Sequence, residues 1–505
     1  MTRLQFNLIA NFAGQGWTAL MALAFVPLYI KFLGIEAYGL IGFYAMLQAA
    51  FQILDLGLSQ TMNREMARYV ALPEKAGEAR DFVRTLEIGY WATGIVLGIG
   101  VVIAAPFIAG HWIKPGSIPV KTIQHAVMIM GIVSVLQWPL SFYEGGLMGL
   151  QRQVLLNSIK IGMATLGVCG AVFILWKVSP TITAYFTWQI IVSSLSVTLL
   201  TVFLWRSLPS SERPPVLSFG LFRNVWRFAA GMSGITLSAI ILTQMDKVIL
   251  SKLLSLEMFG YYTLAGVASS AIPFLLVTPV FNALFPRFTS LVAASDDTAL
   301  KVLYHQGSQL MAVLVLPVAA VLSFFSFDIM LLWTGSAKTA GMSSPIVSVL
   351  VIGMALNALM TLPYALQISH GWTSIGLRIN TFLIITLVPA IYFMATRYGA
   401  VGAAAVWVAL NIIYMAIGIP LTHRRLLTGE MRRWFVEDIG PPAMATILIV
   451  GLGRWFITSP MTPMMTLVSL ATIFLVALAS AVLVTTHMRA WVFSQLAKAR
   501  NIRIT

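Results

Sequence analysis

The chain has 505 residues, of which 10% are charged and 59% are hydrophobic, and its mean hydropathy is +0.87. A soluble domain carries about a quarter charged residues, so this composition excludes a water-soluble globular protein. The formal net charge is +15. Its cations stand beside apolar stretches rather than on a soluble module with interleaved aromatics, which argues against nucleic-acid binding. The single cysteine, Cys169, excludes an internal disulfide and a cysteine-built metal site.

Apolar stretches of about 20 residues recur from end to end, each long enough to cross a hydrocarbon core of about 30 Å. We therefore expect an all-α integral membrane protein with about 14 transmembrane helices. Their predicted centres lie near residues 18, 49, 97, 135, 168, 194, 239, 272, 319, 358, 386, 411, 449 and 475.

The chain contains an internal repeat. The segment KFLGIEAYG, Lys31 to Gly39, returns 221 residues later as KLLSLEMFG, Lys252 to Gly260. In both places the segment ends one apolar stretch and opens the next, and VSPTITA from Val178 falls opposite GAVGAAA from Gly399. This layout is typical of a transporter built from parallel repeats, with two six-helix lobes around a central cavity.

The spans divide the chain into four predicted parts. Residues 1–205 form a first lobe, residues 206–227 a cytoplasmic linker rich in Pro and Ser, and residues 228–422 a second lobe. A short amphipathic helix is expected at Gly220 to Phe228. Residues 423–505 form a C-terminal helix pair and a basic cytoplasmic tail outside the repeat, interpreted as packing material or a lipid-facing brace. With the N-terminus inside, about 23 of the 32 Lys and Arg fall on the cytoplasmic side, so both termini are predicted to be cytoplasmic.

Several prolines lie at membrane depth or near its edge, where each removes a backbone hydrogen bond and kinks its helix. Such kinks suit the bending that alternating access requires, although proline is also simply commoner in membrane helices than in soluble ones. These residues are Pro27, Pro139, Pro273, Pro279, Pro317, Pro363, Pro389 and Pro420.

The sharpest local feature is the segment TQMDKVILSKLLSLEMFGYYTLA, Thr243 to Ala265. It places Asp246 about 27 Å along predicted span seven, toward the outer face. An acid at that depth is a functional candidate by default, because its short side chain cannot reach water. Lys247 is either a second candidate or an outer-interface anchor that extends its amine to water. Gln244 is a further candidate for lining the cavity.

This segment resembles the seventh-span signature of the Wzx-type flippases, which are polysaccharide transporters of the multidrug/oligosaccharidyl-lipid/polysaccharide exporter superfamily. Three other stretches resemble the same family, and the resemblance extends over residues 5 to 420. They are NFAGQGWTALMALAFVPLYIKFLGIEAYGLIGF leading to LDLGLSQTMNREMAR, then GLMGLQRQVLLN, and then RYGAVGAAAVW.

The resemblance implies transfer of an undecaprenyl-pyrophosphate-linked oligosaccharide (an O-antigen, capsule or exopolysaccharide repeat unit) across the bacterial inner membrane by alternating access. It implies a cavity lined mainly by spans one, two, seven and eight. The partners would be the lipid-linked oligosaccharide, membrane lipids and other polysaccharide assembly proteins, with no nucleic acid. No catalytic residue, metal or cofactor is expected, and the sequence has no P-loop for ATP. Coupling to H+ or Na+ is left open.

A pyrophosphate needs cations along its path, and Arg meets phosphate with two parallel hydrogen bonds. Arg64 and Arg287 are the first candidates, because they end spans two and eight, the repeat-related pair. Arg152 and Arg378 also stand near inner ends of spans. Each of the four is equally interpretable as a positive-inside anchor.

Polar side chains share one face of span one, where Asn7, Asn11 and Gln15 follow one another at i, i+4 and i+8. Gln48 and Gln52 do the same on span two. Such residues suit either sugar hydroxyls or interhelical hydrogen bonds. The acids inside or near spans that could titrate or bind a coupling cation are Asp246, Asp55, Glu144 and Asp328.

Two other functions remain open. One is a multidrug or small-solute cation antiporter of the same superfamily, although span one has no ionisable residue between Arg3 and Lys31 for a first-span carboxylate mechanism. The other is a membrane-embedded enzyme such as a polysaccharide polymerase. That class needs a substantial outer loop or a His/Asp cluster, whereas the outer connections here are short and the six histidines are scattered along the sequence.

Overall fold

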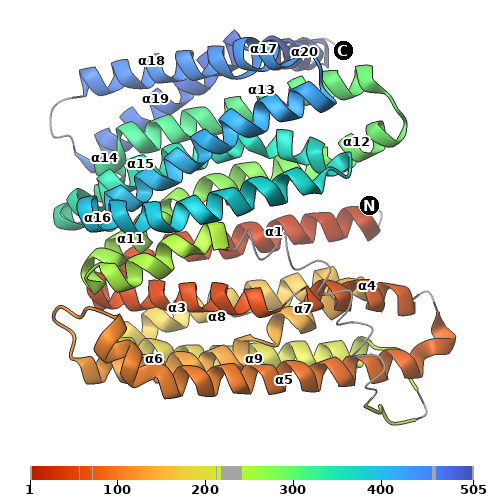
Figure 1. Ribbon diagram of the computed structural model, residues 1–505, viewed down its shortest axis with the longest axis vertical. Helices are drawn as coiled ribbons and strands as arrows, with labels where there is room; N and C mark the ends of the chain where they lie inside the picture. The colour runs from red at the N-terminus through yellow and green to blue at the C-terminus, as the bar shows by residue number, and fades with distance from the viewer. Residues whose placement is uncertain are drawn as a thin grey trace. The chain divides into compact units, whose positions relative to one another are not determined.

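The computed structural model describes residues 3–55, 57–70, 72–211, 213–217, 241–457 and 462–502. In these residues the regular elements are helices, with one isolated bridge between Lys114 and Ser255. The chain forms two compact units, Met1–Gly260 and Tyr261–Thr505, and Figure 1 draws the helices of each. The lobe boundaries expected at residues 205 and 228 stay predictions.

Eleven helices in the described part of the chain are long and apolar enough to cross a membrane, which confirms the all-helical membrane class. The spans expected near residues 386 and 411 both lie in α16 (Thr373–Leu426), which consists of two helices joined at a kink at Gly399, where the backbone is not helical, and which counts once. The span expected near residue 49 corresponds to the 20-residue helix α3 (Ile35–Leu54), which is not among the eleven. The span expected near residue 239 falls largely outside the described residues. These three cases account for the difference from fourteen.

The first unit packs α5 against α6, α4 against α7, and α1 against α8, while α9 contacts both α6 and α8. Residues 241–253 are also helical, and α11 (Leu256–Ser269) begins in this unit and continues past its boundary. The other elements are α1 (Arg3–Ala24), α2 (Val26–Leu33), α4 (Leu58–Val70), η1 (Pro73–Lys75), α5 (Ala76–Phe107), η2 (Ile108–Trp112), α6 (Val120–Gln137), α7 (Leu140–Gly149), α8 (Gln153–Lys177) and α9 (Ile182–Ser207).

The second unit packs its C-terminal helices on α13 (Asp297–Phe324) (Figure 1). Val321 and Phe325 form a buried apolar cluster with Val450 and Ala477, which joins α13 to α18 and α19. The role of the C-terminal pair as packing material or a lipid-facing brace stays a prediction. The remaining elements are η3 (Pro273–Val277), α12 (Thr278–Ala293), α14 (Ser326–Thr334), α15 (Ala337–Ser369), α17 (Met431–Arg433), η4 (Trp434–Ile439), α18 (Gly440–Phe456), α19 (Pro463–Val484) and α20 (Thr486–Ile502).

Some of the prolines expected at membrane depth interrupt helices, and others do not. Pro27 follows the break between α1 and α2, Pro139 stands between α6 and α7, and Pro273 begins the π-helical turn η3. Pro279 lies in the first turn of α12, which continues directly from η3. The prolines inside continuous helices are Pro317, Pro363, Pro389 and Pro420.

The first copy of the repeat anchors an inter-helix loop. Glu36 is 9% exposed and accepts hydrogen bonds from the backbone N–H groups of Gly116, Ser117 and Ile118 at 2.7, 2.8 and 3.3 Å. The Ser117 hydroxyl donates to the same carboxylate at 2.5 Å. The loop between η2 and α6 is thereby held at the start of α3. Gly34 precedes α3 with a φ of 81°, a conformation that glycine adopts without strain.

The described part of the expected linker lies against α5. The Arg213 guanidinium pairs with Asp81 at 2.5 Å, and the Val216 N–H donates to the same carboxylate at 2.7 Å. Arg80 also donates to the carbonyl oxygen of Pro209 at 3.3 Å. This segment is therefore docked on the first unit. The amphipathic helix expected at Gly220 to Phe228 lies outside the described residues.

Candidate functional site

The two arginines that the sequence ranked first have different surroundings. In α4, Arg64 donates from Nε and Nη2 to the carboxylate of Glu65 at 3.0 and 2.6 Å, and its side chain is 51% exposed. In α12, Arg287 lines a cavity of about 600 Å³ together with Asp296 and Gln306. Asp296 uses its side chain to cap α13 through the N–H of Ala299. Arg287 is exposed and forms no hydrogen bond or ion pair with the other residues that the structure describes.

The remaining predicted cationic and amide candidates are Arg152, Arg378, Lys247 and Gln244. Arg152 precedes α8 and Arg378 lies in α16, and both are exposed. Lys247 donates to the carbonyl oxygen of Thr243 at 2.9 Å, one helical turn back. Gln244 is half-buried in the same helical segment. The substrate-binding roles expected for these four residues stay predictions.

The polar face of span one makes interhelical hydrogen bonds. The Asn11 amide donates to Gln153 at 3.0 Å, and Asn157 donates back to Asn11 at 2.6 Å, which ties α1 to α8. Gln48 likewise joins α3 to α6 by donating to Gln137 at 2.9 Å. Gln15 and Gln52 are exposed, and the side chain of Asn7 lies outside the described residues.

Each of the four acids proposed for cation coupling has a protein partner. Asp55 accepts from the Ser59 hydroxyl at 2.8 Å and from the Tyr90 hydroxyl. Ion pairs join Glu144 to Lys160 at 2.8 Å, Asp328 to Arg454 at 3.3 Å, and Asp246 to Lys247 at 3.7 Å. These contacts give every one of the four a structural role besides any part in coupling.

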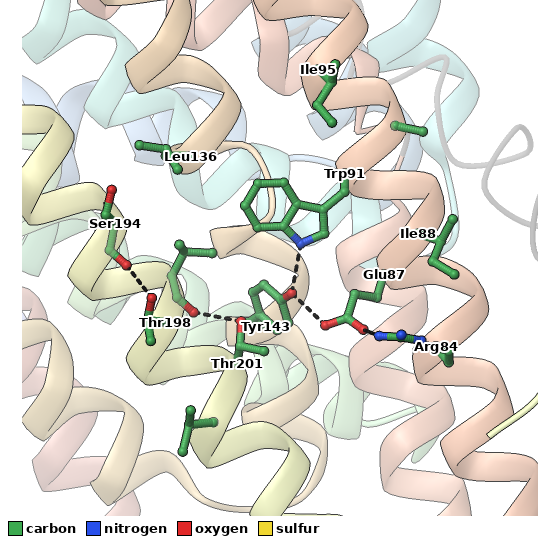
Figure 2. A pocket seen from close by; sticks show the side chains of 13 residues that line it. Arg84, Glu87, Ile88, Trp91, Ile95, Leu136, Tyr143, Ser194, Thr198 and Thr201 are labelled. Atoms are coloured by element: carbon green, nitrogen blue, oxygen red, sulfur yellow. Dashed lines mark hydrogen bonds and ion pairs between the residues drawn. The ribbon is translucent and has the colours of Figure 1, made fainter. Parts of the chain in front are cut away.

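A buried acid that the sequence did not single out lies at the floor of a groove in the first unit. Glu87 is 5% exposed, and it accepts hydrogen bonds from the Tyr143 hydroxyl at 2.7 Å and the Trp205 indole at 3.2 Å. Arg84 forms an ion pair with the Glu87 carboxylate at 3.0 Å, and Trp91 donates to the Tyr143 hydroxyl at 3.1 Å (Figure 2). The sequence does not point to Glu87, because its partners on α7 and α9 are distant from it in the sequence.

The groove above Glu87 is amphipathic and has a volume of about 720 Å³. Figure 2 shows Arg84, Glu87 and Tyr143 grouped together, with Ile95 and Leu136 farther from the charged pair. Hydroxyl groups of α9 contribute further polar atoms. Such a surface can contact a molecule that has both a polar head and hydrocarbon. The α9 hydroxyls and the apolar wall are Ser194, Thr198, Thr201, Ile88, Ile95, Leu136, Val197 and Val202.

The histidines, which are scattered along the sequence, are partly gathered by the fold. His305 and His423 are buried in the second unit, and the backbone N–H of His487 bonds to Gln309 beside them. The acid at the centre of this group is Asp438, which is 0% exposed. None of these residues lines the groove or the Arg287 cavity. The group is therefore an internal polar network.

Comparison with known proteins identifies the family of the chain. The family model described as "Polysaccharide biosynthesis protein" matches residues 5–292, more than half of the sequence. A Shigella flexneri protein assigned as an O-antigen transporter is 22% identical over 425 residues, covering 83% of this chain and 97% of that protein.

Solved structures show the fold. The lipid II flippase MurJ in its inward closed conformation has a TM-score of 0.70 at 12% identity, covering 94% of this chain and 98% of that one. An inward-facing multidrug resistance MATE family transporter of the MOP superfamily has a TM-score of 0.63 at 13% identity, covering 84% and 96%. The chain thus has the fold of that superfamily, and it belongs to the polysaccharide biosynthesis protein family.

Proposed function

We propose that this protein is a flippase that moves an undecaprenyl-pyrophosphate-linked oligosaccharide from the cytoplasmic to the periplasmic leaflet of the bacterial inner membrane. The observation that carries the proposal is the match to an assigned O-antigen transporter along 97% of that protein's length, in a chain of the polysaccharide biosynthesis family. The shared fold with a lipid II flippase supports it at the level of architecture.

The surfaces of the two units suit such a substrate. A lipid-linked oligosaccharide has a charged pyrophosphate and a long hydrocarbon chain, so it needs both cations and apolar walls along its route. Arg287 places an exposed guanidinium at a cavity of about 600 Å³. Arg64 is half-exposed, although it shares its charge with Glu65.

The proposed orientation follows from the distribution of cations. Both termini would be cytoplasmic, because most Lys and Arg lie in connections that are then on the inner side. Other polysaccharide assembly proteins and membrane lipids are the partners that this placement implies. The protein would act as a transporter without catalytic residues.

The deciding experiment is deletion of the protein in its native host, followed by locating the lipid-linked sugar. A flippase predicts build-up of that lipid on the inner leaflet. If the lipid instead reaches the outer leaflet and its chains fail to extend, a polymerase is favoured. Drug uptake by everted vesicles that contain the protein, with normal lipid distribution in the deletion strain, would favour the antiporter.

A further inference from the structure

Both ring nitrogens of His305 face carboxylates. His305 lies in α13 and is 0% exposed. Its Nδ1 is 2.5 Å from Oδ2 of Asp438, and its Nε2 is 3.3 Å from Oε2 of Glu430. An ionised carboxylate only accepts hydrogen bonds, and a neutral imidazole has a hydrogen on one nitrogen alone. With both carboxylates ionised, the two contacts are therefore satisfied together only when His305 carries the extra proton.

The charges around His305 leave Asp438 dependent on that proton. Lys301 and Arg433 both pair with Glu430, at 3.3 and 4.0 Å, and Arg433 also pairs with Glu437 at 3.0 Å. Asp438 is fully buried, and its partners in the described residues are His305 and Gln309, whose amide donates at 3.0 Å. A buried carboxylate without a cation is strongly unfavourable. Of the two partners, only the histidine can provide a positive charge.

The other titratable groups facing this site do not replace the proton. His423, from α16, has its Nδ1 at 2.9 Å from its own helix carbonyl of Ile419 and its Nε2 at 3.3 Å from the Tyr304 hydroxyl. Burial, aided by the charge of Arg433, lowers the pKa of His487 in α20, which disfavours the charged form of this imidazole. The facing groups are Lys301, Tyr304, His423, Glu430, Arg433, Glu437, Asp438 and His487.

The same network joins the C-terminal helices to α13. Gln309, one turn beyond His305, donates to the Thr486 hydroxyl at 3.1 Å and accepts from the His487 N–H at 2.9 Å, both at the start of α20. The Trp434 indole in η4 donates to the Ser308 hydroxyl at 3.2 Å. Through Asp438, η4 contacts His305 itself. The network therefore clamps both ends of the C-terminal helix pair, α18 and α19, where these ends meet α13.

We propose that His305 is a proton-binding site, and that the bound proton locks the C-terminal helix pair to α13. Imidazole is the side chain whose charge changes near physiological pH. When the proton leaves, one carboxylate faces a nitrogen lone pair and the positive charge beside Asp438 is lost. Glu430, whose side chain is 18% exposed, connects His305 to solvent and is the route by which the proton enters and leaves. The residues of this site lie beyond residue 292, where the family match ends, and the proposal does not depend on what the protein transports.

The test uses the purified full-length protein without substrate. Thermal unfolding is followed at several pH values between about 6 and 8 for the wild type and for His305→Gln. The proton favours the locked state, so the wild-type melting temperature should fall by about 2–4 °C as the pH rises across this range. His305→Gln should melt lower at the acidic end and show no such fall. His370→Gln is the matched control, because His370 bonds to its own helix carbonyl at Leu366 outside the network; its profile should follow the wild type.

A parallel offset, in which His305→Gln keeps the wild-type pH dependence, would show that His305 has a packing role only and would overturn the proposal. If the variant does not fold, amide hydrogen exchange of the unmodified protein gives an independent answer. After correction for the intrinsic pH dependence of exchange, peptides from residues 427–439 should lose protection as the pH rises. Peptides within α15, which lies outside the network, should not change. Equal behaviour of the two regions would also reject the site.

Discussion

Gly39 and Gly260 hold the same position in the two copies of the repeat, and each faces the backbone of the other's helix. A Cβ atom at Gly39 would collide with the carbonyl oxygen of Leu256, and one at Gly260 would collide with that of Ile35. Ile35 and Leu256 are themselves repeat partners. The approach of α3 and α11 is therefore reciprocal, and it requires glycine on both sides because the backbones are too close for a side chain.

This crossing predicts that Gly39→Ala or Gly260→Ala destabilises the protein. Each added methyl group meets backbone atoms that cannot rotate away, and overpacking of this kind costs about 1–3 kcal/mol. The melting temperature of the purified protein measures the effect. Gly266→Ala is the control, since Gly266 lies in the same helix as Gly260 and a Cβ there would meet no neighbouring atom within 4 Å among the described residues. It should be neutral or slightly stabilising, because alanine is the better helix former. Equal losses at Gly260 and Gly266 would contradict the steric argument.

The second prediction concerns topology. Cys169→Ala should give a functional cysteine-free background, because Cys169 is exposed and has no disulfide. In that background Lys75→Cys, in the loop predicted to be cytoplasmic, should be protected from an impermeant thiol reagent in intact spheroplasts. Val178→Cys, which replaces a 67% exposed residue between α8 and α9, should react. Labelling at position 75 in intact spheroplasts would reverse the assigned orientation.

The third prediction tests the phosphate path. Replacing Arg64 and Arg287 together by Gln removes two charges and keeps polar bulk, so polymer export should fall about tenfold or more. Lys at either site should retain part of the activity, because it keeps the charge without the two-pronged contact. Export of surface polymer is measured alongside protein level and insertion. Arg424→Gln, at the exposed end of α16, is the control for loss of an inner cation. Normal export by a correctly inserted double variant would make the two arginines anchors only.

The fourth prediction concerns Asp246. If this acid senses a cation or orders the cavity, Asp246→Asn should abolish polymer export and leave protein level and insertion normal. The substitution keeps the size of the side chain and removes the charge that faces Lys247 at 3.7 Å. The assay is export in a deletion strain that carries the variant. Full activity of Asp246→Asn would leave the residue with a structural role.

The fifth prediction is a dependence on acid pH. Burial opposes ionisation of Glu430, but hydrogen bonds and charges from Lys301 and His305 outweigh it and hold the pKa of Glu430 below its usual value of 4.5. The stability that this ionised group contributes is fully present above the ordinary glutamate pKa and is lost as the pH falls through the lowered value. Melting temperatures below pH 4.5 should therefore fall less steeply for Glu430→Gln than for the wild type. Glu78→Gln, which breaks an exposed pair with Lys75, should follow the wild type.

Local sequence features predicted much of the architecture. Span length and apolar content indicate a multi-pass helical membrane protein, because a helix that crosses the hydrocarbon core needs about 20 apolar residues wherever it occurs. The repeat at Lys31 and Lys252 predicted that each copy ends one apolar stretch and opens the next. Gly399 marks the kink between two expected spans. The family resemblance rested on motifs that can be read in the same way. These properties depend on residues that are neighbours in the chain.

The pairing of polar groups was decided only by the tertiary structure. Asn11 bonds to Gln153 and Asn157, and Glu87 bonds to Tyr143 and Trp205, although these partners stand 56 to 146 residues apart. Neither periodicity nor composition specifies which faces of distant helices meet. The clearest case is His305, which the sequence placed among scattered histidines and which the fold sets between Asp438 and Glu430. The low dielectric of a buried site makes such partners energetically decisive, and only helix packing brings them together.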